Sequence, residues 1–386
     1  MKLFSRMDRS FLGRWWWTVD KPLLAMLLAL MAIGAMMVMS ASPPVAERIG
    51  AGQYHFIIRH LVLLGPALML LIGISMMNVT QIRRTAMIVL GSGVLAMILV
   101  LLTGVEIKGA QRWLSLPGFS LQPSEFVKPA FIVLAAWFIA QQKERASFPG
   151  MKIAIGLYVL VVGLLLLQPD MGMTFVVTCC FLAVIFLAGL PFRLVFSLMA
   201  LGVVGFSLAY LGFDHVQSRV DRFLNPESGD TYQIEKSLEA FENGGVLGTG
   251  PGQGTVKLTI PDAHADFIFS VAGEEMGLIF IVVLISLYGY VLVRGFNRIM
   301  DSDDMFVVLG TGGLLTMFGL QAFVHMGSAL SLLPTKGMTL PFISYGGSSL
   351  LSMAMAMGMV LALTRRQARS GIARGGLSIR PIGGAA

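Results

Sequence analysis

Long apolar runs are the feature that most constrains what this chain can fold into. A helix that crosses a bilayer needs about 20 mostly apolar residues, and ten runs of about that length follow one another along the sequence. Their predicted limits are 22–42, 54–77, 86–104, 126–141, 152–169, 172–189, 193–211, 267–293, 305–330 and 345–364. Only 13% of the 386 residues are charged, against about 25% in soluble domains. The sequence therefore predicts an all-α polytopic membrane protein with about ten transmembrane helices.

The basic residues predict which side of the membrane each connection faces. An even number of spans places both termini on one side. If that side is the cytoplasm, its segments hold most of the 28 lysines and arginines, as the positive-inside rule requires. The chain then divides into a cytoplasmic amphipathic N-terminus (1–21), a ten-helix transmembrane domain (22–364) and a basic cytoplasmic tail (365–386). The same rule accounts for the isoelectric point near 9.6 without nucleic acid as a partner.

The connections predicted on the extracytoplasmic side carry the unusual polar sequence. They are the loop 105–125, the Pro169-Asp170 turn and a long segment, 212–266, between the seventh and eighth spans. A connection of that length is typically functional or disordered. Within it, TYQIEKSLEAFENGG predicts an amphipathic helix that lies on the membrane or caps a cavity. Tyr232, Ile234, Leu238 and Phe241 share one side of that helix.

The glycine-rich stretch GGVLGTGPGQGTVK (244–257) follows this helix and superficially resembles a nucleotide-binding loop. It has no Lys-Ser or Lys-Thr after the glycines and no βαβ context, both of which such a loop requires. Two other interpretations are predicted instead. The glycines allow the backbone to turn closely over a cavity, or the exposed amides bind an anionic headgroup.

Charged side chains inside the predicted spans need partners, because an ionised group near the bilayer centre costs at least about 2.5–3.5 kcal/mol. Glu274 and Glu275 are expected to pair with Arg59 and Lys128 in the bundle interior rather than to act in catalysis. The alternative for the two basic residues is to snorkel to the headgroups. His325 is expected to be a hydrogen-bonded packing residue. The five histidines are scattered, which argues against a dedicated metal cage.

The segment PTKGMTLPFISYGGSS (334–349) joins two apolar runs but is itself unsuited to a helix. Pro334 and Pro341 interrupt helix formation, and the glycines between 337 and 347 allow close approach. Non-helical backbone at this depth is tolerated only where it lines a cavity or is buried in protein. The segment is therefore predicted to be a cavity wall that carries Lys336.

Six motifs together resemble the SEDS family of bacterial cell-wall polymerases. They occur in family order and cover nearly the whole chain: GAQRW (109–113), QPSEFVKPA (122–130), QPDMG (168–172), YQIEKSLEAFENGGVLGTGPGQG (232–254), HADFIFSVAGEEMG (264–277) and LPTKGMTLPFISYGGSS (333–349). Within the family, the lysine of PTKG resembles the cell-division member; the elongation member usually lacks it. An elongation polymerase remains the alternative.

The resemblance implies a peptidoglycan glycosyltransferase that polymerises lipid II at the outer face of the cytoplasmic membrane, at the division septum. Asp266 matches the essential aspartate of the family and is the candidate general base. Its place at the start of an apolar helix predicts partial desolvation, which raises a carboxylate pKa. Arg112 and Lys336 are candidates to hold the diphosphate, Glu125 and Lys128 to orient the cavity. Gln122 and Ser344 complete the predicted substrate-binding set.

The resemblance also implies partners. A class B penicillin-binding protein, an FtsI-type transpeptidase, would crosslink the strands, and other membrane proteins of the division complex would accompany it. A magnesium or manganese ion could bridge the diphosphate and one carboxylate, since such sites use few protein ligands.

Two other function classes stay open on the sequence alone. Ten spans with central charges and Pro/Gly interruptions also suit a transporter that flips lipid II, although the polar residues gather on one side. A scaffold without activity is the third possibility, and the intact Asp266, Arg112 and Lys336 count against it.

Overall fold

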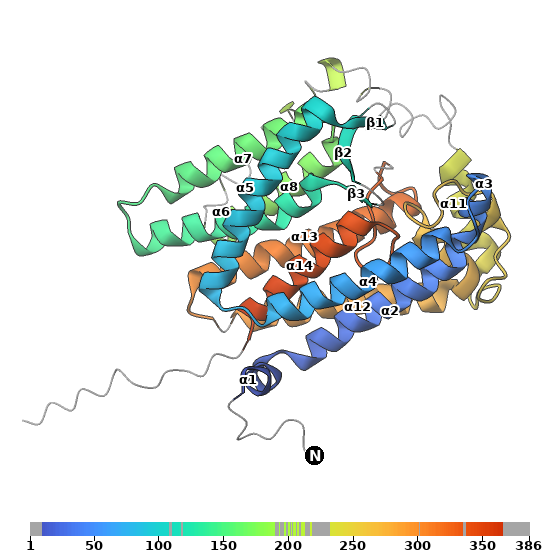
Figure 1. Ribbon diagram of the computed structural model, residues 1–386, viewed down its shortest axis with the longest axis horizontal. Helices are drawn as coiled ribbons and strands as arrows, with labels where there is room; N and C mark the ends of the chain where they lie inside the picture. Colours follow the sequence, from blue (N-terminus) through green and yellow to red (C-terminus); the bar gives the residue numbers. More distant parts are fainter. Residues whose placement is uncertain are drawn as a thin grey trace, which may run out of the picture.

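The computed structural model describes residues 10–107, 110–116, 119–189, 232–300, 302–334 and 337–365, with single positions between 193 and 217. It is a bundle of long helices with a small sheet at one end (Figure 1). The helices are α1 (Phe11–Thr18), α2 (Lys21–Ala41), α3 (Pro43–Arg48), α4 (His55–Ser75), α5 (Val79–Thr103), α6 (Pro123–Glu144), α7 (Gly150–Leu167), α8 (Met171–Leu187), α11 (Tyr232–Gly244), α12 (Ile268–Met300), α13 (Met305–Ala329) and α14 (Gly347–Leu363).

The helices confirm the prediction of an all-helical polytopic membrane protein. Seven of them are long and apolar enough to cross a membrane, and the shorter α8 and α14 are also apolar. These nine coincide with nine of the ten predicted spans. The remaining one, 193–211, lies largely outside the described residues.

Two helices extend well beyond their predicted spans. The helix α5 begins at Val79 rather than at 86, and α12 continues to Met300 rather than ending at 293. Each extra stretch carries arginines, which a count of apolar residues excludes although the helical hydrogen bonds continue through them. A capping box between Asn78 and Gln81 fixes the start of α5.

The interior of the bundle is formed by α6, α13 and α14. In α6, 83% of the span is buried inside the protein, and in α13 72%. The helix α6 contacts α5, α7, α8, α13 and α14, and α14 packs along α4. The other spanning helices are largely exposed on their outer faces, as expected where lipid contacts them.

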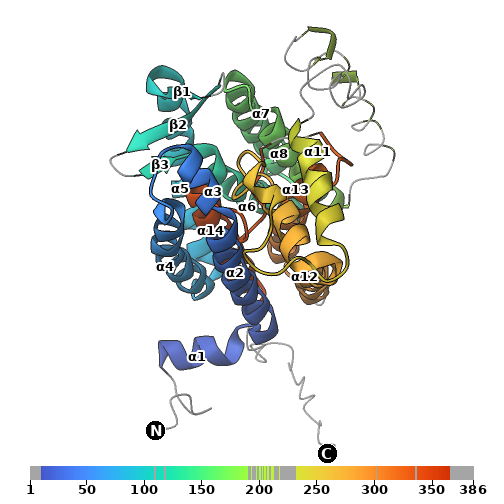
Figure 2. The same cartoon turned by 90° about the vertical axis from the view of Figure 1, so that its right-hand side faces the viewer.

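One end of the bundle carries most of the non-helical structure. We call it the loop end, defined by α3, α11 and the strands β1 (Val105–Ile107), β2 (Ala110–Leu116) and β3 (Phe119–Leu121). Figure 2 looks onto this end. The strands form an antiparallel sheet in the order β1-β2-β3. The sequence predicted only a connection here, because a hydropathy pattern does not register strands of three to seven residues.

The helix predicted within the long loop is confirmed as α11, but only part of its predicted apolar side packs against the protein: the ring of Phe241 contacts α12. Tyr232 and Leu238, placed on the predicted apolar side, are exposed. The buried side is made of small residues, among them Ser237 and Gly244, and it lies against α12. A Cβ at Gly244 would lie 2.1 Å from the carbonyl oxygen of Gly273. Small residues therefore let the two backbones touch, as in membrane helix pairs.

The helix α12 is kinked at Gly277, and the glycine-rich loop fills the gap. Gly277 has φ +75°, which frees backbone groups from the helical pattern. The amides of Thr249 and Gly250 donate to the carbonyl oxygens of Glu274 and Glu275, both at 2.9 Å. In return, the amides of Leu278 and Ile279 donate to the loop carbonyls of residues 245 and 246. The loop therefore satisfies the backbone of the kink.

Two glycines in α12 provide a matched test of this packing. A Cβ at Gly273 would lie 2.2 Å from the ring of Phe241 in α11, whereas a Cβ at Gly289 meets nothing within 4 Å. Gly273→Ala is therefore expected to destabilise the protein by about 1–3 kcal/mol, the usual cost of overpacking. Gly289→Ala is expected to have no such cost, because alanine favours the helix. Thermal unfolding in one detergent checks this, and equal melting temperatures for both variants would contradict the α11–α12 contact.

Candidate active site

Asp266 lies at the loop end, two residues before α12 begins at Ile268. Its side chain is partly buried, and its amide donates to the carbonyl oxygen of Asp262 at 3.0 Å. A Cβ placed on Gly337 would lie 3.5 Å from Oδ2 of Asp266. The segment that follows Lys336 in the sequence therefore runs directly beside this carboxylate. Lys336 itself lies outside the described residues.

The segment 337–345 holds the chain around Asp266 through hydrogen bonds. The hydroxyl of Ser344 donates to the carbonyl oxygen of Ala265 at 2.7 Å and accepts from the amide of Leu340 at 2.8 Å. The next residue, Tyr345, donates its amide to the carbonyl oxygen of His264 at 2.9 Å. Ser344 is buried, so its hydroxyl positions the Asp266 segment. This geometry favours a positioning role over the predicted substrate contact.

A histidine of α13 fixes the same segment from the other side. Nδ1 of His325 lies 2.6 Å from the carbonyl oxygen of Met338. His325 is buried, which confirms it as a hydrogen-bonded packing residue. The segment 337–345 is thus held both to the chain before α12 and to the core of the bundle, and its residues 340–344 are buried. Its predicted role as a cavity wall stays a prediction.

A row of hydroxyls at the start of α14 links this segment to α6. The hydroxyl of Ser349 lies 2.5 Å from that of Thr339. Ser348 accepts from the amide of Gln122 at 2.9 Å, and Ser352 donates to the carbonyl oxygen of Glu125 at 2.6 Å. Gln122 is the N-cap residue of α6. The first turns of α14 therefore place the predicted residues of α6 relative to the Asp266 segment.

Glu125 and Lys128 form an ion pair one turn apart on α6, with Nζ 2.9 Å from Oε2. The side chain of Lys128 is only 1% exposed, which rules out snorkelling for this lysine. A buried pair of this kind holds its two charges in fixed places, because separating them would leave an uncompensated charge in a low-dielectric interior. The role of orienting the cavity stays a prediction for this pair.

Arg112 on β2 binds the turn between α7 and α8. Its Nε donates to the carbonyl oxygen of Gln168 at 3.2 Å, and its Nη2 donates to that of Pro169. Its Nη1 lies 3.7 Å from the carboxylate of Asp170, which also caps α8. These contacts join the sheet to the helical bundle. They leave the Arg112 side chain 24% exposed.

An aromatic cluster next to Asp266 was not predicted from the sequence. The ring of His264 lies between Phe56 of α4, with centroids 4.3 Å apart, and Tyr345, 5.1 Å away. Phe56 and Tyr345 also meet edge to face at 5.0 Å. Burial lowers the pKa of His264 to about 4, so its imidazole is neutral near pH 7. A neutral, stacked ring two residues from Asp266 further fixes that segment.

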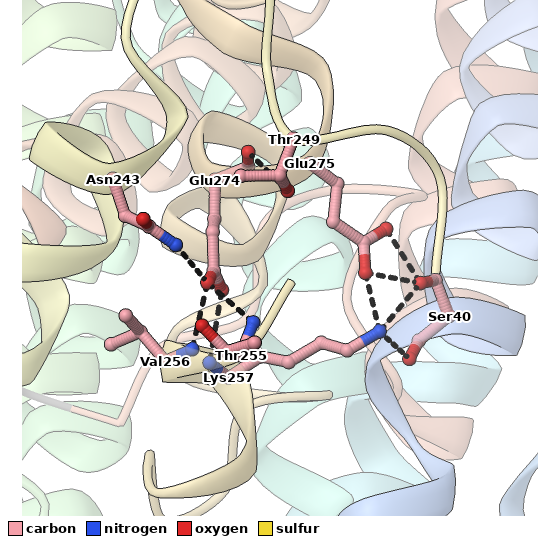
Figure 3. Close-up of polar contacts among 8 residues, drawn as sticks. All are labelled: Ser40, Asn243, Thr249, Thr255, Val256, Lys257, Glu274 and Glu275. Carbon is pink, nitrogen blue, oxygen red and sulfur yellow. Dashed lines mark hydrogen bonds and ion pairs between the residues drawn. The ribbon is translucent and has the colours of Figure 1, made fainter. Parts of the chain in front are cut away.

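Glu274 and Glu275 pair with the outer loop, and the predicted pairing with Arg59 and Lys128 is wrong. Figure 3 shows the contacts. Glu275 accepts from Nζ of Lys257 and from the hydroxyl of Ser40, the latter at 2.5 and 2.6 Å. Lys257 also donates to Ser40 at 3.2 Å. The pair thereby ties α2, the loop and α12 together. Lys257 was overlooked because it lies in a loop that hydropathy treats as solvated.

The amides at the end of the glycine-rich loop bind Glu274. Oε1 accepts from the amides of Thr255 and Val256 at 2.7 Å and from Nδ2 of Asn243 at 2.8 Å, while Oε2 accepts from the amide of Lys257 at 2.9 Å. The prediction that the amides of this loop bind an anionic group is therefore met in part. The anion is an internal carboxylate rather than a headgroup, and the glycines bring the loop close to α12.

The chain is similar to known proteins over nearly its whole length. The family model described as "Cell cycle protein" (FtsW/RodA/SpoVE) matches residues 21–369. A probable peptidoglycan glycosyltransferase FtsW of Caulobacter vibrioides is 44% identical over 94% of this chain and 94% of that protein. The FtsW of Coxiella burnetii, described in the same words, is 37% identical over 90% of this chain and 96% of that protein.

Solved structures show the same fold. The crystal structure of the Thermus thermophilus rod-shape-determining protein RodA has a TM-score of 0.67 and 30% identity, covering 91% of this chain and 99% of that one. A structure of a peptidoglycan synthase complex that coordinates polymerisation and crosslinking includes a chain with a TM-score of 0.75 and 30% identity, covering 90% and 97%. With a family match over nearly its whole length, this chain belongs to the SEDS family, the FtsW/RodA/SpoVE proteins.

Proposed function

We propose that this chain is a peptidoglycan glycosyltransferase of the FtsW type that polymerises lipid II during septal wall synthesis. The observation that carries the proposal is the Asp266 carboxylate, fixed at the loop end between α12 and the segment that follows Lys336. The names of the relatives support the reaction class. The basic N-terminal and C-terminal segments support a topology with both termini in the cytoplasm and the loop end outside.

The proposed reaction moves one proton and exchanges one bond. The hydroxyl oxygen of the acceptor sugar attacks the anomeric carbon of the donor, and Asp266 takes the hydroxyl proton. The bond from that carbon to the polyprenyl diphosphate breaks as the new glycosidic bond forms. Asp266 needs a fixed position within hydrogen-bond reach of the hydroxyl. Ser344 and Tyr345 supply this by donating hydrogen bonds to the carbonyl oxygens of Ala265 and His264.

The leaving diphosphate needs positive charge that is already in place. Lys336, the residue before Gly337 in the sequence, is proposed to supply this charge to the diphosphate as a point charge. Arg112 is proposed as a second cation, and the nearby carboxylate of Asp170 partly offsets its positive charge. The buried pair Glu125–Lys128 and Gln122 are proposed to shape the cavity rather than to contact the reacting atoms.

A divalent cation fits this site only as a companion of the substrate. Among the described residues, no three His, Cys, Asp or Glu side chains come together to hold a metal. A magnesium or manganese ion bound to the diphosphate needs few protein ligands, and one carboxylate of the site would serve. Such an ion would add to the charge that Lys336 supplies to the diphosphate.

The proposed partner is a class B penicillin-binding protein, with other division proteins in the same assembly. The similar chain in the peptidoglycan synthase complex supports this, because that complex combines polymerisation with crosslinking. Polymerisation by this chain then supplies the strands that the partner crosslinks.

Asp266→Asn is expected to abolish detectable polymerisation. Asparagine is nearly the same size but lacks the basic site, and general-base assistance is typically worth about 10²–10⁴ in rate. Glycan synthesis from labelled lipid II and binding of the partner should be measured on one preparation. Polymer formed at the wild-type rate would remove Asp266 from the reaction.

Lys336→Ala is expected to slow polymerisation sharply, and Lys336→Arg to retain part of the rate. The arginine keeps the charge in a different shape, whereas the alanine removes it. Lys152, exposed in the first turn of α7 at the other end of the bundle, offers a matched Lys→Ala control. An alanine variant at position 336 as active as the Lys152 variant would exclude the diphosphate role.

His264 is expected to make stability depend on pH. Its pKa is about 4 in the folded protein, below the ordinary value of 6.5, because it is buried. Below pH 6.5 the unfolded chain takes up a proton that the folded chain does not, so stability is full above pH 6.5 and falls towards pH 4 by up to about 1.4 kcal/mol per pH unit. Thermal unfolding of His264→Gln over this range should show a shallower loss; an unchanged slope would contradict the assignment.

A further inference from the structure

The end of the bundle opposite the loop end carries a cluster of charges that the proposed reaction does not use. We call it the α1 corner: Asp20, Lys21, Arg294 and Arg298 with the indoles of Trp16 and Trp17. The helix α1 lies crosswise below the start of α2 (Figure 2). Trp15 fixes it there, because its Nε1 donates to the hydroxyl of Ser75 at 2.9 Å. The apolar span of α2 begins at Lys21, so the corner lies at the membrane boundary.

Asp20 holds two arginines from the last turns of α12. Its side chain is completely buried and accepts from Nε of Arg294, at 3.2 Å from Oδ2, and from Nε of Arg298. The same carboxylate caps α2 by accepting from the amide of Leu23 at 3.1 Å. The arginine side chains are 35% and 24% exposed. In the described part of the chain, both use only Nε for these contacts, so their terminal amino groups remain for a ligand.

Lys21 adds a third cation, which two tryptophans hold in place. Its Nζ lies 4.7 Å from the ring centroid of Trp16 and 4.5 Å from that of Trp17. Cation–π contacts of this kind restrict a long side chain that would otherwise be mobile. The four charged residues of the corner carry a net charge of about +2, since one carboxylate faces three cations.

We propose that the α1 corner binds the phosphate group of an anionic phospholipid. Guanidinium groups match phosphate with paired donors, and basic pockets between transmembrane helices bind anionic headgroups. The tryptophans support a lipid rather than a soluble phosphate, because indoles prefer the headgroup level. The carboxylate of Asp20 sets the orientation of both arginines before the lipid arrives. The ligand is a lipid of the leaflet that contacts α1, independent of the substrate at the loop end.

The test measures lipid binding by the full-length protein in nanodiscs of phosphatidylcholine doped with phosphatidylglycerol. Lys21→Gln and Arg294→Gln are each expected to weaken retention of phosphatidylglycerol about fivefold, the effect of removing one cation near the site. Arg294→Gln leaves Asp20 paired with Arg298, so folding is preserved even if Lys21→Gln folds poorly. Arg84→Gln is the matched control, because Arg84 is exposed at the start of α5 and outside the corner.

Two further measurements distinguish a lipid site from a site for soluble phosphate and from general electrostatic attraction. Asp20→Asn removes the carboxylate that orients both arginines and is expected to weaken retention even though it raises the net positive charge of the corner. Stronger retention would show that net charge alone attracts the lipid and would overturn the site. Glycerol phosphate added to the phosphatidylglycerol-doped nanodiscs is expected not to displace the retained lipid; displacement would point to a soluble phosphate and overturn the lipid assignment. Equal weakening by Arg84→Gln and Arg294→Gln would show general attraction to a negative surface and would also overturn the site.

Discussion

The hydrogen bonds between the segment 337–345 and the chain before α12 are the constraint on which the candidate site depends. Ser344 and Tyr345 hold the carbonyl oxygens of Ala265 and His264, and Gly337 lies against Asp266. A carboxylate in an irregular turn would otherwise sample many positions, and general-base chemistry needs one. Because both segments are largely shielded from solvent, their polar groups need partners within the fold.

The same requirement explains the loop that covers α12. A helix kinked at Gly277 exposes carbonyl and amide groups that neither lipid nor the helix can satisfy. The glycine-rich loop provides the missing partners, and Glu274 fixes the end of that loop through three amides. Lys257 neutralises the buried carboxylate of Glu275, the residue next to Glu274. The glycine-rich loop, α2 and α12 are thus held together as one unit, and Asp266 lies just before α12 in the sequence.

Apolar runs predicted most of the helices because the length of a hydrophobic segment can be counted directly in the sequence. The tertiary partners of the charged residues were not predicted, because a charge pattern does not specify which loop lies over which helix. Glu275 was expected to find Arg59 or Lys128, yet Lys257 is its partner. Asp266 was predicted from the family motif, whereas His264, two residues away, was not. The spacing of Ser348 and Ser352, one helical turn apart in α14, was an available signal for the hydroxyl row that links α14 to α6.

The central claim is that this chain forms glycosidic bonds at its loop end, instead of moving lipid II across the membrane. The most direct measurement incubates the purified protein with labelled lipid II, alone and with the proposed class B penicillin-binding protein, and resolves the products by length. Glycan chains are expected, in higher yield with the partner. Lipid II that crosses the bilayer of a proteoliposome without any chain formation, with the partner bound, would contradict it and favour the transporter.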